Sequence, residues 1–548
     1  MTKYYFNLLA LIALVSSLNV FNSCTDGNHD KIPDTSSGNG LSESDANALV
    51  NAVYGPLQRL SSSYTFLVES ATETAISFEE ADDSKDGPQV SVLETTPSNW
   101  YPIKVFSSLY QSISAANLAI DSVQASSLID SIKNLYIARA LFIRGYDYFQ
   151  LVQLFGEVPL ILTSNPTAEE RTTRRSIDDV YNQVITDLTN ATAHLPYYSS
   201  LKPNPTQLAA KTILAKAYLT WGQIPLSQTD VETIKSSKVD PAKPAVNTAY
   251  LQQAAALADE VISSGKYCLL PDFYKIWGDD NGGSDNENND EVIFSVQHKG
   301  DGIDVQGNHQ THCGFTWPKD ERKDPHISYA DISFQNALPD NDKRKLFSYV
   351  TSVSYSDNNI DTLTWPLSIV RPGKWIHRLQ EDMNLASDYQ PNDIDHIDFR
   401  LAEVYLIKAE AAFLLGNTSE ALQAINAVRE RAGVADLTTL TAQDLYNEWS
   451  YEFAFEQKHW QNLVRWHTLI STILEKVPTF EYYKEAYNDI NLFKALPGAD
   501  ESRFAFYQRV YKHLHSKVNH IDGHFYRFPI PLSESYTDLG ITPQNPGY

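Results

Sequence analysis

Apolar residues recur with helical spacing on both sides of a short turn in residues 399–433. In FRLAEVYLIKAEAAFL, and again in SEALQAINAVRER, apolar side chains return every three or four residues, so each run places them on one face of a helix. Gly416 suits the left-handed backbone that ends the first helix, and Thr418 or Ser419 can cap the second. The pattern predicts a helical hairpin of the tetratricopeptide type, which usually serves as a binding scaffold.

The same spacing recurs along much of the chain. Residues 134–155 and 176–195 form one predicted helical pair, residues 207–221 and 249–264 form another, and residues 442–474 supply a further long helical region. These pairs are unevenly spaced and interrupted, whereas a regular solenoid would show a steadier period. The sequence therefore predicts a mainly α scaffold of tetratricopeptide-like hairpins.

Two spans of the sequence differ in composition and pattern from the predicted helices. Residues 271–395 are rich in Asp, Asn, Gly and Pro and contain short β-like runs such as EVIFSVQ, and residues 475–548 are similarly irregular. Loops of this length in a compact protein are either disordered or functional, and their aromatic content favours function. We therefore expect long irregular loops and a few short strands on the helical base, within a single compact unit.

The first residues have the pattern of an export signal. An apolar run over residues 6–20 is too short to span a bilayer comfortably, and it ends shortly before Cys24. A small residue followed by Cys resembles the lipobox of bacterial lipoproteins, and an ordinary secretion signal with an incidental Cys is the alternative. The sequence thus predicts a signal peptide over residues 1–23, lipidation of Cys24, and a flexible polar tether over residues 24–40.

Charge and composition narrow the function classes. The net charge of −25 argues against nucleic acid and against direct binding of anionic lipid headgroups, because both require patches of Lys and Arg. The chain has 31 Tyr, 23 Phe and 9 Trp but only 2 Met, a balance that suits ligands that stack on rings. An aromatic-rich core and surface would give the same composition.

Four blocks of sequence resemble the SusD/RagB family. They are ARALFIRGYDYFQLVQLFGEVPL at residues 138–160, FRLAEVYLIKAEA at 399–411, YEFAFEQKHWQNLVRWH at 451–467, and the ending FPIPLSESYTDLGITPQNPGY at 528–548. Each block alone is weak, but all four occur in the family's order, as does the lipobox. In the third block the family pattern prefers Gly, Arg and Asp where this chain has Gln457, His459 and Asn462.

The resemblance implies a role at the cell surface. Family members are outer-membrane lipoproteins of Bacteroidota that bind glycans, or in some cases peptides, and cap a TonB-dependent barrel transporter of the SusC type. By this resemblance, residues 41–270 form an N-terminal helical region, residues 271–395 a ligand-binding region, and residues 396–548 a C-terminal helical region with closing loops. A subunit that only gates the transporter and a glycan hydrolase are the alternatives.

Aromatic side chains outside the predicted core are candidates for stacking on a sugar face. Trp317 lies in a loop, where it either stacks on the ligand or anchors the loop. Trp100 begins a predicted helix, where it either reaches the ligand or staples the helix. Tyr329 and Trp365 are weaker candidates. The remaining tryptophans are predicted to pack internally: Trp221, Trp277, Trp375, Trp449, Trp460 and Trp466.

Metal and disulfide chemistry has little support in the sequence. The Asp- and Asn-rich loop at residues 279–290 offers oxygen ligands, but its spacing does not match a calcium-binding loop, so a solvated loop is the prediction. His309, His312 and Cys313 lack an evident fourth ligand. Cys268 and Cys313 are a possible disulfide in an exported protein, and the sequence leaves this open. Neither a metal nor a cofactor is predicted.

The carboxylates offer no clear catalytic pair. Glu452 and Glu456 lie one helical turn apart, whereas a glycosidase places two carboxyl groups across a cleft, about 5–10 Å apart. Pairs on one helix face are more often surface or capping charges. The chain also lacks the short motifs of serine hydrolases, zinc proteases and nucleotide-binding enzymes. The prediction is a non-enzymatic binding protein.

Overall fold

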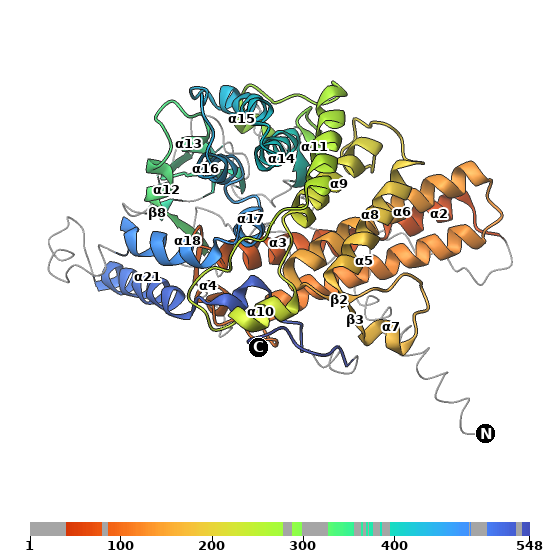
Figure 1. Ribbon diagram of the computed structural model, residues 1–548, viewed down its shortest axis with the longest axis horizontal. Coiled ribbons are helices and arrows are strands. Elements are labelled where there is room, and N and C mark those ends of the chain that lie inside the picture. Colours follow the sequence, from red (N-terminus) through yellow and green to blue (C-terminus); the bar gives the residue numbers. More distant parts are fainter. Residues whose placement is uncertain are drawn as a thin grey trace.

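The fold is mainly helical with a few short strands, as the sequence predicts (Figure 1). The computed structural model describes residues 40–78, 86–277, 288–298, 327–355, 363–364, 369–370, 372–375, 384–385, 395–481, 483, 501–532 and 540–548.

The long helices form one continuous row in which each packs against the next. The contacts run from α3 to α5, α6, α8, α9, α11, α14 and α15, and Figure 1 shows the row passing from α5 and α6 to α14 and α15. Helix α2 packs against α5 and α6 at the N-terminal end of this row. The bounds are α2 Glu43–Asn51, α3 Tyr54–Ser70, α5 Trp100–Ala125, α6 Asp130–Phe155, α8 Ile177–Thr192, α9 Gln207–Gly222, α11 Thr248–Ser263, α14 Leu401–Leu414 and α15 Thr418–Ala432.

Local signals in the sequence explain where several helices begin and end. The Ser176 hydroxyl accepts a hydrogen bond from the backbone N–H of Asp179, 3.1 Å away, and so caps α8 as predicted. Gly416 has φ +81° at the turn of the predicted hairpin, in the left-handed region that glycine adopts without strain. The expected cap by Thr418 or Ser419 is wrong, because α15 already begins at Thr418, and Asn417 precedes it without a side-chain capping bond.

Further helices and 3-10 turns lie between members of the row in the sequence or follow α15. They include α4 Asp86–Ser91, α7 Ala168–Thr172, α10 Gln228–Ile234, α12 Ile332–Asn336, α13 Arg344–Ser348, α16 Ala442–Glu452, α17 His459–Trp466, α18 Leu469–Lys476, α21 Glu501–His520 and the 3-10 turns η1 Phe273–Ile276, η2 Gly373–Trp375, η3 Val477–Thr479 and η4 Gly523–Tyr526. The expected helical region over residues 442–474 is thus divided into three helices. The expected irregular span over residues 475–548 contains a helix of 20 residues, α21.

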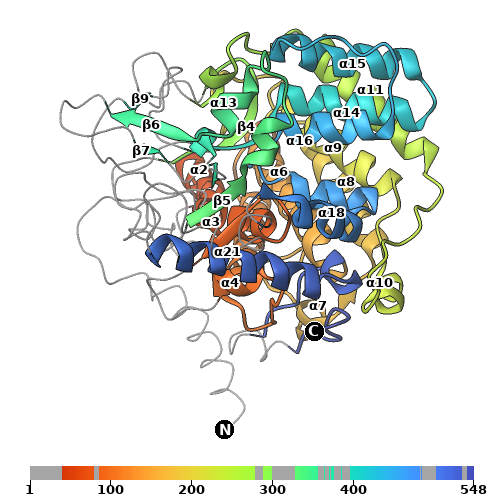
Figure 2. The same cartoon turned by 90° about the vertical axis from the view of Figure 1, so that its left-hand side faces the viewer.

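In the described part of the chain, the strands form four small sheets. Figure 2 shows β6, β7 and β9 on the side of the molecule opposite α8, α9 and α11. In the first sheet, β5 Ile327–Asp331 lies antiparallel between β1 Ile76–Phe78 and β8 Ile369–Val370. In the second, β6 Ser352–Tyr355 is antiparallel to β7 Leu363–Thr364 and parallel to β9 Asn384–Leu385. The other two sheets are antiparallel pairs, β4 Val292–Val296 with β10 His396–Arg400 and β2 Val158–Pro159 with β3 Arg174–Arg175.

Most of the tryptophans predicted to be internal do pack in the core. Trp221, Trp277, Trp449, Trp460 and Trp466 are all buried. The backbone at Trp375 forms a 3-10 turn, where the sequence suggested a strand-like run. Most of the indole rings therefore pack in the core, which leaves few exposed tryptophans to contact a ligand.

Candidate functional site

The start of α5 presents an exposed tryptophan on a rigid support. Asn99 is buried and caps the helix, because its side-chain oxygen accepts from the backbone N–H of Tyr101 at 3.1 Å. The Asn99 amide nitrogen donates to the carbonyl oxygen of Asp86 at 2.9 Å and to the side chain of Gln89 at 3.2 Å, both on α4. The position from which Trp100 projects is therefore fixed by two helices.

The Trp100 ring itself is held by its neighbours while remaining accessible. It is 44% exposed, among the largest exposures of any described aromatic residue. Tyr101 meets it edge-on, with ring centroids 5.1 Å apart, and Tyr101 in turn stacks on buried Phe66 of α3 at 4.2 Å. Lys104 Nζ lies 5.3 Å from the indole centroid, which places a cation and hydrogen-bond donor beside the ring. Such a ring with an adjacent donor is suited to a sugar, which offers both an apolar face and hydroxyl groups.

Of the four predicted stacking residues, the structure describes the side chain of Trp100 alone. The backbone of Tyr329 lies in β5, opposite Ile76 of β1. Strand β1 packs against α4, the helix that also holds Asn99, so Tyr329 and Trp100 belong to the same region of the fold. Trp317 and Trp365 lie outside the described residues, as does Cys24.

A cavity of about 140 Å³ opens near the end of α3, between α12, α16, α17 and η3. Aromatic rings form one wall in a continuous series: the Phe480 and Phe334 centroids are 5.5 Å apart, Phe334 stacks with Tyr349 at 6.2 Å, and Tyr349 meets Phe455 edge-on at 5.5 Å. The rim is exposed at Ala337 and elsewhere, so the cavity is open to solvent. No pattern in the sequence pointed to this cavity, since its walls come from segments up to 400 residues apart.

A buried carboxylate lies at the floor of this cavity. Glu73 is 1% exposed, and its Oε1 accepts from His459 Nε2 at 2.8 Å, with Lys476 Nζ 3.7 Å away. Burial alone would raise the pKa of Glu73, but the opposing charge and hydrogen bond of His459 lower it to about 2. Glu73 is therefore ionised at neutral pH.

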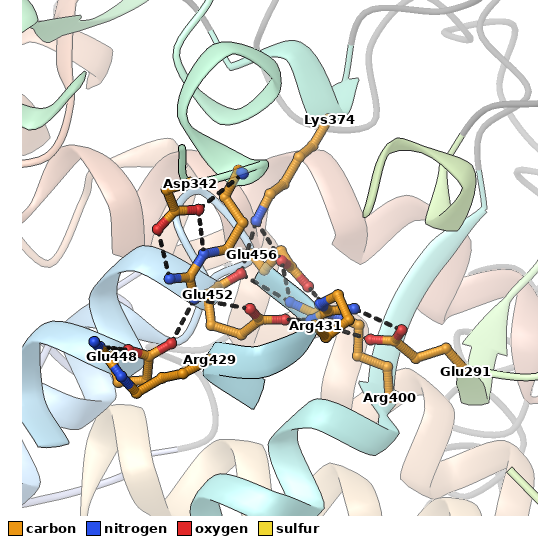
Figure 3. A network of polar contacts seen from close by, with 10 residues as sticks. Glu291, Asp342, Lys374, Arg400, Arg429, Arg431, Glu448, Glu452 and Glu456 are labelled. Carbon is orange, nitrogen blue, oxygen red and sulfur yellow. Dashed lines mark hydrogen bonds and ion pairs between the residues drawn. The ribbon is translucent and has the colours of Figure 1, made fainter. Parts of the chain in front are cut away.

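A second group of charges is buried except for Arg429, whose side chain is 19% exposed, and it serves structure. Figure 3 shows Arg400 and Arg431 bridging Glu291 and Glu452, with Glu456 and Lys374 beside them. Arg344 joins this cluster to Asp342 and Glu448, and Arg429 pairs with Glu448 at 2.9 Å. Five cationic side chains thus oppose five carboxylates. We call these ten residues the buried charge network: Glu291, Asp342, Arg344, Lys374, Arg400, Arg429, Arg431, Glu448, Glu452 and Glu456.

The network corrects the expectation for Glu452 and Glu456. They were expected to be surface or capping charges, whereas they are 0% and 5% exposed. Although burial raises the pKa of Glu452, Arg431, Arg400 and Arg344 together hold it well below its usual value. The pKa of Glu456 is also lowered, since Arg400 and Lys374 outweigh its burial. Both carboxylates are ionised and paired, which leaves neither free to act as an acid or base toward a substrate.

These lowered pKa values predict a loss of stability in acid. A carboxyl group whose folded-state pKa lies below its unfolded value of 4.5 contributes stability fully above that value, and the contribution is lost as the pH falls through the folded pKa. For Glu73 this window runs from 4.5 down to about 2. The free energy of unfolding in urea should therefore fall steadily below about pH 4.5. Unchanged values between about pH 5 and about pH 3 would contradict the assignment of these carboxylates as ionised and paired.

The remaining chemical expectations concern metals and cysteines. Within the described ranges, no group of three or more His, Cys, Asp or Glu is placed to hold a metal ion. Residues 279–287 of the acidic loop and His309, His312 and Cys313 lie outside the described residues. Cys268 is exposed and has no disulfide partner among the described residues, so pairing with Cys313 stays open. No helix in the described part of the chain is both long and apolar enough to cross a membrane.

Comparison with known proteins identifies the class. A family model described as the SusD family matches residues 263–548, and another, described as starch-binding associating with outer membrane, matches residues 30–219. The first match covers more than half of the chain. The chain therefore belongs to the SusD family, as its four sequence blocks indicated.

Individual relatives agree in sequence and in fold. A SusD-like protein of Bacteroides ovatus is 26% identical over 402 residues, which cover 69% of this chain and 68% of the relative. The crystal structure of a SusD homolog from Bacteroides thetaiotaomicron superposes with a TM-score of 0.68 at 20% identity, covering 93% of this chain and 98% of that one. Surface glycan-binding protein A from the same species, solved in complex with laminarihexaose, gives 0.66 at 15% identity, covering 92% and 99%. At these identities the two structures show a shared fold.

Proposed function

We propose that the protein captures oligosaccharides at the outer surface of the cell and delivers them to a TonB-dependent barrel transporter of the SusC type. In this role it is a non-enzymatic lipoprotein anchored in the outer membrane through Cys24. The helical row forms the platform that contacts the transporter. The region around Trp100, together with Tyr329, Trp317 and Trp365, contributes rings to the ligand surface.

The observation that carries this proposal is the exposed Trp100 ring on its fixed support. An indole that merely stapled α5 would be buried against that helix, whereas this one is 44% exposed beside Lys104. Family membership supports the same ligand class, because a relative of the same fold is a glycan-binding protein solved with laminarihexaose. The description of the matched N-terminal model, starch-binding associating with outer membrane, supports the proposed location.

Replacing Trp100 with Ala is expected to weaken oligosaccharide binding about tenfold, because the stacking face is lost while the Asn99 cap and the core ring Tyr101 remain. Titration calorimetry of the purified chain against a panel of β-glucan, α-glucan, xylan and mannan oligosaccharides measures this. Tyr197→Ala is the matched control, since Tyr197 is 46% exposed and lies in the loop after α8. The Tyr197→Ala variant should bind the oligosaccharide with the affinity of the unsubstituted chain.

The same panel separates the alternatives. Binding of peptides with no binding of any glycan would overturn the glycan assignment. An uptake defect in cells carrying Trp100→Ala, with unchanged ligand affinity, would favour a subunit that only gates the transporter. Release of shorter products from any glycan by the purified chain would overturn the non-enzymatic assignment.

A further inference from the structure

We propose that the 140 Å³ cavity beside Glu73 is a separate binding site for a single neutral sugar unit. The inference rests on the proposed function for the ligand class, carbohydrate, and adds a site whose lining residues do not include Trp100. A cavity of roughly 150 Å³ accommodates a six-membered ring. The enclosed volume thus holds about one six-membered ring, and the open rim leaves room for the substituents of that ring.

The cavity walls provide the apolar contact that a sugar ring requires. Four aromatic rings of the wall contact one another in series: Phe480, Phe334, Tyr349 and Phe455. Because each ring is held by its neighbour, no single ring can move into the cavity and fill it. The C–H face of a pyranose packs on such rings, whereas its hydroxyl groups point around the edge. The opposite side of the cavity is polar, which gives the site two different walls.

The polar wall holds an unused hydrogen-bond acceptor in a buried position. Among the described residues, none donates a hydrogen bond to Glu73 Oε2, although Glu73 is 1% exposed and its Oε1 is bonded to His459. An ionised carboxylate oxygen left without a donor in a buried position is costly, and such atoms usually have a partner. Since Glu73 lines the cavity, a ligand hydroxyl can supply the missing donor.

The other polar groups around the cavity complement a polyol. The Ser450 hydroxyl donates to the carbonyl of Tyr446 at 2.8 Å, and the Thr479 hydroxyl donates to the carbonyl of Lys476 at 2.7 Å, so each oxygen keeps lone pairs with which it can accept from a ligand. Asn447 accepts from Gln443 through Oδ1 at 2.9 Å, which leaves its NH₂ group to donate. Hydroxyl groups both donate and accept, so a polyol satisfies this mixed set with one small ligand.

The charges argue against an ionic ligand. Lys476 Nζ lies 3.7 Å from Glu73 Oε1, so the one carboxylate on the wall already faces an opposite charge. A ligand ammonium group would meet Lys476, and a ligand carboxylate would meet Glu73. A neutral ligand avoids both repulsions, and this selects a neutral hexose or pentose over an amino sugar or a uronic acid.

The test measures monosaccharide binding to the full chain by saturation-transfer NMR and titration calorimetry, with glucose, galactose, mannose, xylose, glucosamine and glucuronic acid as probes. At least one neutral sugar should bind with a millimolar Kd, and the two charged sugars should bind more weakly. Ser450→Leu places a leucine in the cavity from a half-buried helical position and should weaken that binding at least about tenfold. Ser122→Leu is the matched control, because Ser122 is a half-buried serine in the last turn of α5, and its binding should be unchanged.

A second variant keeps the test decisive if Ser450→Leu fails to fold. Thr479→Val removes one acceptor from the exposed rim at constant shape and should weaken neutral-sugar binding several-fold. Absence of monosaccharide binding, a preference for a charged sugar, or unchanged binding in folded Ser450→Leu would each overturn the cavity assignment. If oligosaccharides still bind in those cases, the proposed function stands; if no glycan of any length binds, both fail.

Discussion

Replacing Arg400 with Met is expected to lower the free energy of unfolding by about 3–5 kcal/mol, because it leaves buried carboxylates without their shared cation. Arg400 is 1% exposed, and all of its guanidinium nitrogens donate hydrogen bonds. Nε donates to Glu456 Oε2 at 2.8 Å, and Nη1 donates to Glu291 Oε1 at 2.8 Å and to the Glu452 carboxylate. Nη2 donates to the Glu452 carbonyl and to Glu456 Oε1, both at 2.8 Å. Methionine preserves much of the volume but none of these bonds. Urea unfolding monitored by circular dichroism measures the loss.

Exposed arginine provides the control for this change. Arg175 in β3 is exposed, so Arg175→Met should alter the free energy of unfolding by no more than about 0.5 kcal/mol. A loss below about 1 kcal/mol for Arg400→Met would mean that the remaining cations, Lys374 and Arg431, compensate for the missing guanidinium. That result would show that the cations of the buried charge network are redundant and that Arg400 is not essential to it.

The sequence predicted the helical row because helices carry their own signals. In α14 and α15 the apolar residues repeat every three or four positions, and the turn between them contains a glycine at φ +81°. Such periodicity and local chain chemistry do not depend on distant partners. The buried strand β4, Val292–Val296, was recognisable for the same reason, since all five of its residues are apolar or small.

Where prediction failed, distant partners decide the structure. The break between α16 and α17 includes Phe455 at φ +61° and Gln457 at φ +63°, conformations that non-glycine residues rarely adopt. The backbone N–H of Gln457 donates to Glu69 Oε1 at 2.7 Å, across 388 residues of sequence, and this bond helps to hold the turn. Gln457 is also one of the positions at which this chain departs from the family pattern. No local signal could have revealed a partner so far away.

The sequence of helix α21 has the apolar spacing of a helix, but its apolar stripe is narrow. Phe506, Val510, Leu514 and Val518 recur every fourth residue, and Leu514 is fully buried. The residues between them are polar, charged, aromatic or His, so the apolar stripe is a single row, whereas most core helices show a wider face. For the ligand site, the sequence singled out Trp100 but could not choose between exposure and stapling, because that outcome depends on how α3 and α4 support the start of α5.

Replacing Lys517 with Met is expected to lower the free energy of unfolding by about 3 kcal/mol or more, because one buried ammonium group satisfies three backbone carbonyls. Lys517 is 1% exposed on α21, and its Nζ donates to the carbonyls of Ser70 at 2.9 Å and Ala75 at 3.1 Å, and also to that of Thr72. Burial lowers the pKa of Lys517 to about 7, so below that pH the change also removes a cation from the C-terminal end of α3, where the helix dipole favours positive charge. Urea unfolding again measures the loss.

The position of Lys517 links this prediction to ligand binding. The three carbonyls belong to the segment that carries Glu73 from the end of α3 to β1, so releasing them should also disturb the floor of the cavity. Lys512→Met, one and a half turns earlier on an exposed face of α21, should change the free energy of unfolding by no more than about 0.5 kcal/mol. Equal effects of the two substitutions would show that α21 docks on residues 70–75 through apolar packing alone. A large loss confined to Lys517→Met would show that this single side chain fixes the segment in place, and with it the carboxylate on which the sugar-sized cavity depends.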